Sequence, residues 1–147
     1  MLFVILPNEP VLTPNPGLTP MMLNHAAWVT PDAAATTDFY TRIMGMKVFR
    51  QKDMPEQRYT VVFLGYGEGN ADGSTEIELT YNHGVDHYEI GTAYGHIALG
   101  VDDVAGTCEK IRAAGGVITR EAGPVKGGQT IIAFVQDPDG YKVELIQ

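Results

Sequence analysis

At 147 residues, the chain has the length of one ordinary globular domain. Hydrophobic residues make up 44% of it and charged residues 19%, a balance that excludes an intrinsically disordered chain. The formal net charge is −8 and no basic stripe is visible, so nucleic acids and anionic membranes are excluded as expected partners.

The N-terminus begins with six apolar residues and continues into a proline-rich stretch, PVLTPNPGLTP. So short an apolar run cannot span a membrane, and without a basic region before it the run is a poor signal peptide. We expect residues 1–20 to be an extension, either disordered or added as a leader, and residues 21–147 to form a single domain. Cys108 is the only cysteine, which excludes an intramolecular disulfide and fits a reducing compartment, so we expect a cytoplasmic protein.

An internal repeat organises this domain. When the chain is shifted by 71 positions, the segment that begins at His25 falls on the segment that begins at His96. Matching pairs across this shift are His25 with His96, Asp32 with Asp103, Gly45 with Gly116, and Phe63 with Phe134. We expect this register to hold without a gap as far as Phe63. Five additional residues then follow in the first half, after which Glu78 aligns with Glu144.

Each half predicts the same order of elements. An apolar strand starts at the histidine, and a helix follows, with an aspartate near its start and glycine at its end. Strands rich in β-branched residues come next, at 46–52, 58–66 and 75–82 in the first half and at 117–121, 129–136 and 141–146 in the second. The turns NADG and DPDG separate the last two strands of each half. The predicted fold class is therefore α+β, with two repeated β-α-β-β-β modules, 21–90 and 91–147. Their curved mixed sheets surround a metal-binding cleft, with the helices outside.

Two histidines and two glutamates occupy equivalent positions in this repeat. His25 and His96 lie on the first strand of each module, and Glu78 and Glu144 lie on the last. A pseudo-twofold axis between the modules would bring both pairs to one point. Two imidazoles and two carboxylates suit Zn²⁺, Ni²⁺, Co²⁺ or Fe²⁺ better than Ca²⁺ or Mg²⁺. A lone strand glutamate or histidine would be interpreted as a solvated or hydrogen-bonded residue, and only the repeat favours a metal site.

Three further residues could ligate a metal or react. His83 and His87 are four residues apart in YNHGVDHYE, but Gly84 and the flanking turn residues favour a loop, and we interpret both histidines as loop surface. Cys108 falls within the second predicted helix, where a small buried residue is a better interpretation than a reactive thiol.

Several segments carry a family resemblance: DFYTRIMGMKV, YTVVFLGYG, IELTYNHGVD, AYGHIALGVDD, EAGPVKGG and AFVQDPDGYKVELI. They cover most of residues 38–147 and resemble bacterial glyoxalase I (lactoylglutathione lyase), of the vicinal-oxygen-chelate superfamily. The four metal ligands of that family fall on His25, Glu78, His96 and Glu144. The resemblance implies a homodimer with its active sites at the subunit interface, where one chain supplies His25 and Glu78 and the other supplies His96 and Glu144.

The resemblance also implies a reaction and a cofactor. The short bacterial form is similar to the nickel- or cobalt-activated class, so one Ni²⁺ per site is preferred, with Zn²⁺ or Co²⁺ as alternatives. The implied reaction converts the hemithioacetal of methylglyoxal and glutathione to S-lactoylglutathione by metal-assisted proton transfer through an enediolate. By resemblance, Glu144 is the catalytic base and Glu78 is its counterpart on the other face.

Substrate-binding residues follow from the same resemblance. Asn82 matches a residue that the family uses to bind the peptide, and Arg120 and Lys126 place positive charge on a glycine-bearing loop near the mouth of the site. One position departs from the family pattern. Close bacterial relatives carry an arginine four residues after the first histidine, where this chain has Val29, so its affinity for the thiol and the identity of the thiol are in question.

Two other classes of function compete with this prediction. One is a different metal-dependent enzyme of the superfamily, such as a thiol transferase, a dioxygenase or an epimerase. The other is a resistance protein that binds a small molecule without metal. Glu78 as a fourth ligand argues against the transferase and the dioxygenase. The complete set of two histidines and two glutamates, which we call the quartet, argues against the metal-free binder.

Overall fold

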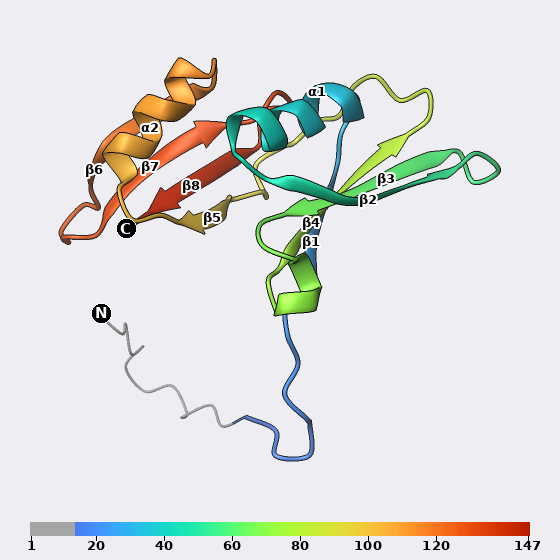
Figure 1. The fold of residues 1–147 in the computed structure, drawn as a ribbon, viewed down its shortest axis with the longest axis horizontal. Helices are drawn as coiled ribbons and strands as arrows, with labels where there is room; N and C mark the ends of the chain where they lie inside the picture. The colour runs from blue at the N-terminus through green and yellow to red at the C-terminus, as the bar shows by residue number, and fades with distance from the viewer. Residues whose placement is uncertain (1–13) are drawn as a thin grey trace.

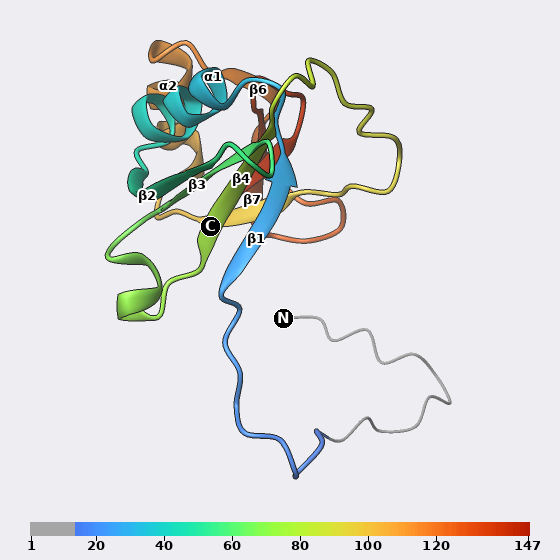
Figure 2. The same cartoon turned by 90° about the vertical axis from the view of Figure 1, so that its right-hand side faces the viewer.

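The structure is a computed structural model that describes residues 14–147. Residues 14–24 contain no helix or strand, and Figure 2 shows them leading away from the folded body. This arrangement agrees with an extension before the repeated core, while the part of that prediction that concerns residues 1–13 lies outside the described residues. Among residues 14–147, no helix has the length and apolar character needed to cross a membrane.

The first half of the domain forms a four-stranded sheet in the order β1-β4-β3-β2, in which β1 is parallel to β4 and the other neighbours are antiparallel. We call it the first sheet. Its module comprises β1 (His25–Val29), α1 (Ala33–Asp38), the π-helix η1 (Phe39–Ile43), β2 (Lys47–Met54), β3 (Tyr59–Gly65), the 3₁₀-helix η2 (Gly69–Asp72) and β4 (Glu76–Asn82).

The second half repeats this arrangement in the order β5-β8-β7-β6, which we call the second sheet. Its module comprises β5 (Ile97–Gly100), α2 (Val104–Ala113), β6 (Val117–Pro124), β7 (Ile131–Gln136) and β8 (Lys142–Ile146). Figure 1 shows the two sheets next to each other, with α1 and α2 on the same side of them. The predicted fold class of repeated β-α-β-β-β modules with mixed sheets is therefore confirmed.

Both helices begin as the sequence predicts, but they differ in length. The side chains of Asp32 and Asp103 each accept a hydrogen bond from a backbone N–H of the first turn. Six α-helical and five π-helical residues follow in the first module, one more than the ten residues of α2. The equivalent glycines after these helices are Gly45 and Gly115, with φ of 76° and 94°, rather than Gly45 and Gly116.

The predicted gapless register is therefore wrong between the helices and the third strands. Arg50 stands opposite Phe63 in the first sheet and Arg120 stands opposite Phe134 in the second, so β2 and β6 are related by 70 positions rather than 71. A second bulge in β6, between Arg120 and Gly123, restores the original spacing. One π-helical residue and one β-bulge compensate for each other, which a sequence comparison without gaps cannot detect.

A buried polar contact joins the two modules. The Tyr40 hydroxyl, on η1, donates a 3.0 Å hydrogen bond to the carboxylate of Asp137, at the turn after β7. Asp137 is 3% exposed, and burial raises its pKa to about 6. Beside this contact, the ring of Trp28 lies 5.8 Å from the rings of both Tyr40 and Tyr141. One hydrophobic core thus continues from the first module into the second.

Candidate metal centre

Each sheet carries one histidine and one glutamate on neighbouring parallel strands. Glu78 lies on β4 beside β1, and Glu144 lies on β8 beside β5. Their ladder neighbours are Ala27 and Phe63 for Glu78, and Ala98 and Phe134 for Glu144. These neighbours are themselves equivalent in the repeat, so the two modules place the two glutamates at the same point of the same sheet topology.

The side chains make equivalent contacts. His25 Nε2 lies 3.1 Å from Glu78 Oε2, and His96 Nε2 lies 3.0 Å from Glu144 Oε2. The imidazoles are 38% and 42% exposed, whereas the carboxylates are 21% and 13% exposed. Each pair therefore forms a preassembled unit with an open side.

Strand alternation explains why these pairs face outwards. Side chains along a strand point alternately to the two faces of the sheet. The neighbours of Glu78 on its strand, Ile77 and Leu79, are buried in the core, as are Val143 and Leu145 beside Glu144. The glutamates consequently occupy the opposite face of each sheet.

One expectation is corrected by this geometry. The two pairs stand on different sheets, and within residues 14–147 no three His, Cys, Asp or Glu side chains gather closely enough to hold a metal ion. A pseudo-twofold axis inside one chain does not bring the quartet to one point, because each pair is tied to the outward face of its own sheet. A single chain therefore presents two separate histidine–glutamate pairs, each of which we call a half-site of the predicted metal centre.

The donor set and its spacing fit a divalent transition metal. Imidazole nitrogen and carboxylate oxygen bind such ions at about 2.0–2.2 Å, so adjacent donors around an octahedral ion lie about 3.0 Å apart. The N–O distances of 3.1 Å and 3.0 Å match this separation. Each half-site could therefore occupy two adjacent positions of such an ion without rearrangement of the strands.

The predicted substrate-binding residues are spread over both sheets. Asn82, at the end of β4, lies on the same strand face as Glu78 and donates a 2.8 Å hydrogen bond to the hydroxyl of Tyr88. Arg120 is in the same ladder row as Glu144, but its guanidinium donates to the backbone oxygens of Ile132 and Pro124. The third predicted residue, Lys126, lies in the β6–β7 turn, and Val29, at the position where relatives carry arginine, lies at the end of β1.

The rival residues do not form a site in the described part of the chain. His83 lies in the turn after β4, as predicted, but its side chain is half-buried and lies 2.9 Å from the hydroxyl of Thr60 and 3.3 Å from Asp53. His87 is exposed and pairs with Glu89 at 2.7 Å, as a surface loop residue should. Cys108 is 1% exposed, and burial raises the pKa of its thiol, which confirms the prediction of a small buried helix residue.

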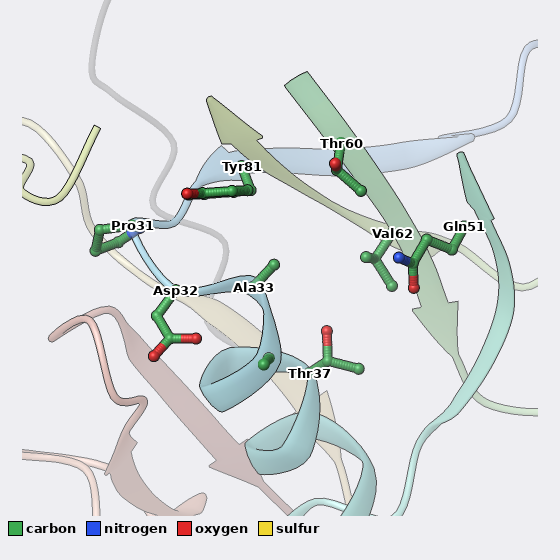
Figure 3. Close-up of a pocket in the computed structure, with 9 residues that line it drawn as sticks. Pro31, Asp32, Ala33, Thr37, Gln51, Thr60, Val62 and Tyr81 are labelled. Atoms are coloured by element: carbon green, nitrogen blue, oxygen red, sulfur yellow. The ribbon is translucent and has the colours of Figure 1, made fainter. Parts of the chain in front are cut away.

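A cavity of about 610 Å³ lies away from the histidine–glutamate pairs. Figure 3 shows it between α1 and the first sheet, where Val62, Thr60 and Tyr81 approach it from the strands and Thr37 approaches it from the helix. Val62 precedes Phe63 on β3, so it points to the face opposite Glu78. The cavity shares no residue with the predicted metal centre.

Two aromatic residues of the site were not identified as functional from the sequence. Phe63 packs edge-on to the ring of His25 with 5.9 Å between centroids, and Phe134 packs edge-on to His96 at 5.2 Å. Both restrict the orientation of the imidazole beside them. Their match across the repeat was the available signal, although strand phenylalanines are ordinarily interpreted as core residues.

The fold and the two half-sites together define the class of protein. A family model described as Glyoxalase/Bleomycin resistance protein/Dioxygenase superfamily matches residues 22–145, and the chain belongs to this superfamily. Within it, the chain is 56% identical to the lactoylglutathione lyase of Haemophilus influenzae over 127 residues, which is 86% of this chain and 93% of that protein. It is 58% identical over the same length to the lactoylglutathione lyase of Escherichia coli O157:H7, again with 86% and 93% coverage.

Solved structures show the same fold. Glyoxalase I from Zea mays superposes with a TM-score of 0.81 and 52% identity, over 86% of this chain and 44% of the maize chain. This chain therefore spans less than half of the maize protein. The trypanothione-dependent glyoxalase I of Leishmania major superposes with a TM-score of 0.74 and 44% identity, over 88% of this chain and 87% of that one.

Proposed function

We propose that this chain is a lactoylglutathione lyase, which isomerises the hemithioacetal of methylglyoxal and glutathione to S-lactoylglutathione. The observation that carries the proposal is the pair of matched half-sites, His25–Glu78 and His96–Glu144, each with its N–O contact near 3 Å. Two relatives named lactoylglutathione lyase, at 56% and 58% identity, support this member of the superfamily over the transferases, dioxygenases and metal-free binders. We also propose the cytoplasm as its location.

We infer that the working form is a homodimer. Each half-site supplies two donors and keeps an open side, and a single chain does not bring the two together within its described residues. Two chains related by a twofold axis can place the first half-site of each against the second half-site of the other. Both sites of the dimer are then completed, with His25 and Glu78 from one chain and His96 and Glu144 from its partner.

The quartet would hold one divalent ion, with Ni²⁺ preferred and Zn²⁺ or Co²⁺ as alternatives. When bound, the ion supplies Lewis-acid stabilisation of the negative charge that develops on the substrate oxygens. The protein residues supply the proton movement. Glu144 takes a proton from one carbon of the substrate and returns it to the next, and Glu78 occupies the equivalent place on the other side. The family resemblance assigns the base to Glu144, whose carboxylate is 13% exposed in the single chain, against 21% for Glu78.

Asn82, Arg120 and Lys126 are proposed to bind the peptide part of the thiol. The side-chain amide of Asn82 is already oriented by Tyr88, on the same strand face as Glu78. Arg120 must exchange its backbone acceptors at Ile132 and Pro124 for a carboxylate of the substrate, which is a stronger, charge-assisted partner.

A complementation experiment tests the shared site. His25→Ala and His96→Ala each disable both sites of their own homodimer. After unfolding and refolding together, about half of the dimers are mixed and each has one intact site, so about a quarter of wild-type activity should return. The readout is the ultraviolet absorbance of the thioester product. No recovery from a mixture that forms dimers would contradict the assignment.

The metal is tested by reconstitution. The metal-stripped protein is loaded separately with Ni²⁺, Co²⁺ and Zn²⁺ and assayed with methylglyoxal and glutathione, and Ni²⁺ should give the highest rate. Turnover with another thiol but not with glutathione would agree with Val29 at the position where relatives have arginine. Wild-type protein that binds none of the three ions would refute the proposed function.

A further inference from the structure

Glu76 is a buried carboxylate that the proposed chemistry does not use. Its side chain is 3% exposed, and it stands opposite His25 in the β1–β4 ladder. One carboxylate oxygen, Oε1, accepts a hydrogen bond of 3.0 Å from the backbone N–H of Asn70. The other, Oε2, faces Arg50 Nη2 at 2.7 Å and has no further hydrogen-bond partner among residues 14–147.

Arg50 connects this carboxylate to the metal half-site. Its guanidinium carbon lies 3.7 Å from the centre of the Phe63 ring, in a cation–π contact. Phe63 in turn packs edge-on to His25, and it is the ladder neighbour of Glu78. A continuous set of contacts therefore leads from the buried charge of Glu76, through Arg50 and Phe63, to the imidazole that would bind metal.

The five additional residues of the first module help to enclose this ion pair. They produce the segment around η2, whose Asn70 binds Glu76 and whose Gly69 lies directly against it. A Cβ at Gly69 would stand 2.5 Å from Glu76 Oε1 and 2.9 Å from the ring of Phe49, at a φ of +62°. Only glycine fits there without displacing the carboxylate.

The second module lacks this arrangement. Lys142 stands two residues before Glu144, where Glu76 stands two residues before Glu78. Arg120, the ladder equivalent of Arg50, is turned towards backbone oxygens of its own module. Among residues 14–147, His96 and Phe134 are therefore in contact without an equivalent arginine–glutamate ion pair behind them.

We propose that Glu76 and Arg50 are positioning residues that fix Phe63 and His25, so that the first half-site is held more rigidly than the second. This inference rests on the proposed metal centre. Arg50 alone would leave an uncompensated positive charge beside a cation site, and Glu76 alone would leave a buried carboxylate that competes with Glu78 for the imidazole of His25. The two charges therefore position Phe63 and His25 without disturbing the metal site only when both are present.

The test is a double-mutant cycle of Arg50→Met, Glu76→Gln and the double variant. In metal-stripped protein, the ring resonances of His25 should shift in each single variant while those of His96 stay unchanged. Each single variant should also bind Ni²⁺ about tenfold more weakly by calorimetry. The double variant should recover to within about threefold of the wild type, because neither charge is then left unpaired.

Two matched controls accompany the cycle. Lys142→Gln changes the residue at the position equivalent to Glu76, and Arg112→Met removes an arginine that pairs with Glu121 and Glu109 on the surface. Both should leave Ni²⁺ affinity within about twofold of the wild type.

Unchanged His25 resonances, or a double variant whose loss equals the product of the two single losses, would overturn the proposal. So would equal shifts of His25 and His96, which indicate general destabilisation. Wild-type protein without Ni²⁺ affinity would refute the metal centre instead, and the His25 resonances of the metal-free variants would still decide the positioning role.

Discussion

The two modules hold equivalent histidine–glutamate pairs, yet they differ in what lies behind the histidine. In the first, Arg50 packs on the ring of Phe63 and pairs with the buried Glu76, whereas in the second the equivalent arginine is turned away and Lys142 replaces the glutamate. The N–O distances of the pairs differ by only 0.1 Å despite this. Strand register thus sets the distance between the paired atoms, whereas the residues behind each pair differ between the modules.

The largest difference between the two modules is expected when the carboxylate of each pair is removed in turn. Glu144→Gln should lower kcat by about 10²–10⁴-fold, because a carboxamide cannot accept the proton. Glu78→Gln should cause a smaller loss. The measurement is steady-state turnover with methylglyoxal and glutathione, and circular dichroism checks that both variants fold.

Near-wild-type turnover by Glu144→Gln would refute its role as the base. Equal losses in the two variants would mean that the modules share the proton transfer, and the difference in burial between the two carboxylates would then have no catalytic consequence.

The contact between the modules offers a second test, through pH. Burial raises the pKa of Asp137 from 3.8 to about 6, so between these values the folded chain binds a proton that the unfolded chain has released. The contribution of Asp137 to the free energy of unfolding is therefore full below pH 3.8 and is lost as the pH rises through about 6. The loss amounts to roughly 3 kcal/mol.

The measurement is denaturant unfolding of metal-free protein between these pH values, with Asp137→Asn as the comparison. The variant has no carboxyl at this position, so the wild type should lose stability relative to it as the pH rises. Parallel pH profiles for the two proteins would show that burial does not raise the pKa of Asp137 in the folded chain.

The smallest expected effect concerns the helix caps. Asp32→Ala and Asp103→Ala each remove a side-chain acceptor from a first-turn N–H, at a cost of about 1 kcal/mol. Equal shifts in thermal unfolding would show that the modules depend on their caps alike. A larger effect at Asp103 would indicate that the π-helical turn lets the first helix adjust to the loss.

Much of this architecture was predictable because it depends on local patterns. The strand predicted at 75–82 is found at Glu76–Asn82, and both capping aspartates are where the sequence places them. Hydrophobic alternation also put Glu78 on the face opposite Ile77 and Leu79, which the structure confirms. The metal role of the quartet stays a prediction, supported by the geometry of the two pairs.

Other features depend on contacts between distant segments and were not predictable. The π-helical residue and the compensating bulge leave no mark on a gapless comparison, because hydrogen-bond partners rather than residue types define them. Glu76 resembles any solvated strand glutamate until η2 and Arg50 cover it. His83 lies in the predicted loop, but its contacts with Thr60 on β3 and Asp53 on β2 depend on strand packing and could not be seen in the sequence.

By itself, the sequence determined the repeated module, its strands and the residue types available to bind a cation, since hydrophobic periodicity and internal duplication can be read from the order of residues alone. The family resemblance implied that the four donors divide into two pairs, whereas only the tertiary structure decided that one pair has an ion pair with a buried carboxylate behind it. That outcome depends on which face of which sheet each side chain occupies, and that is settled when the strands pack.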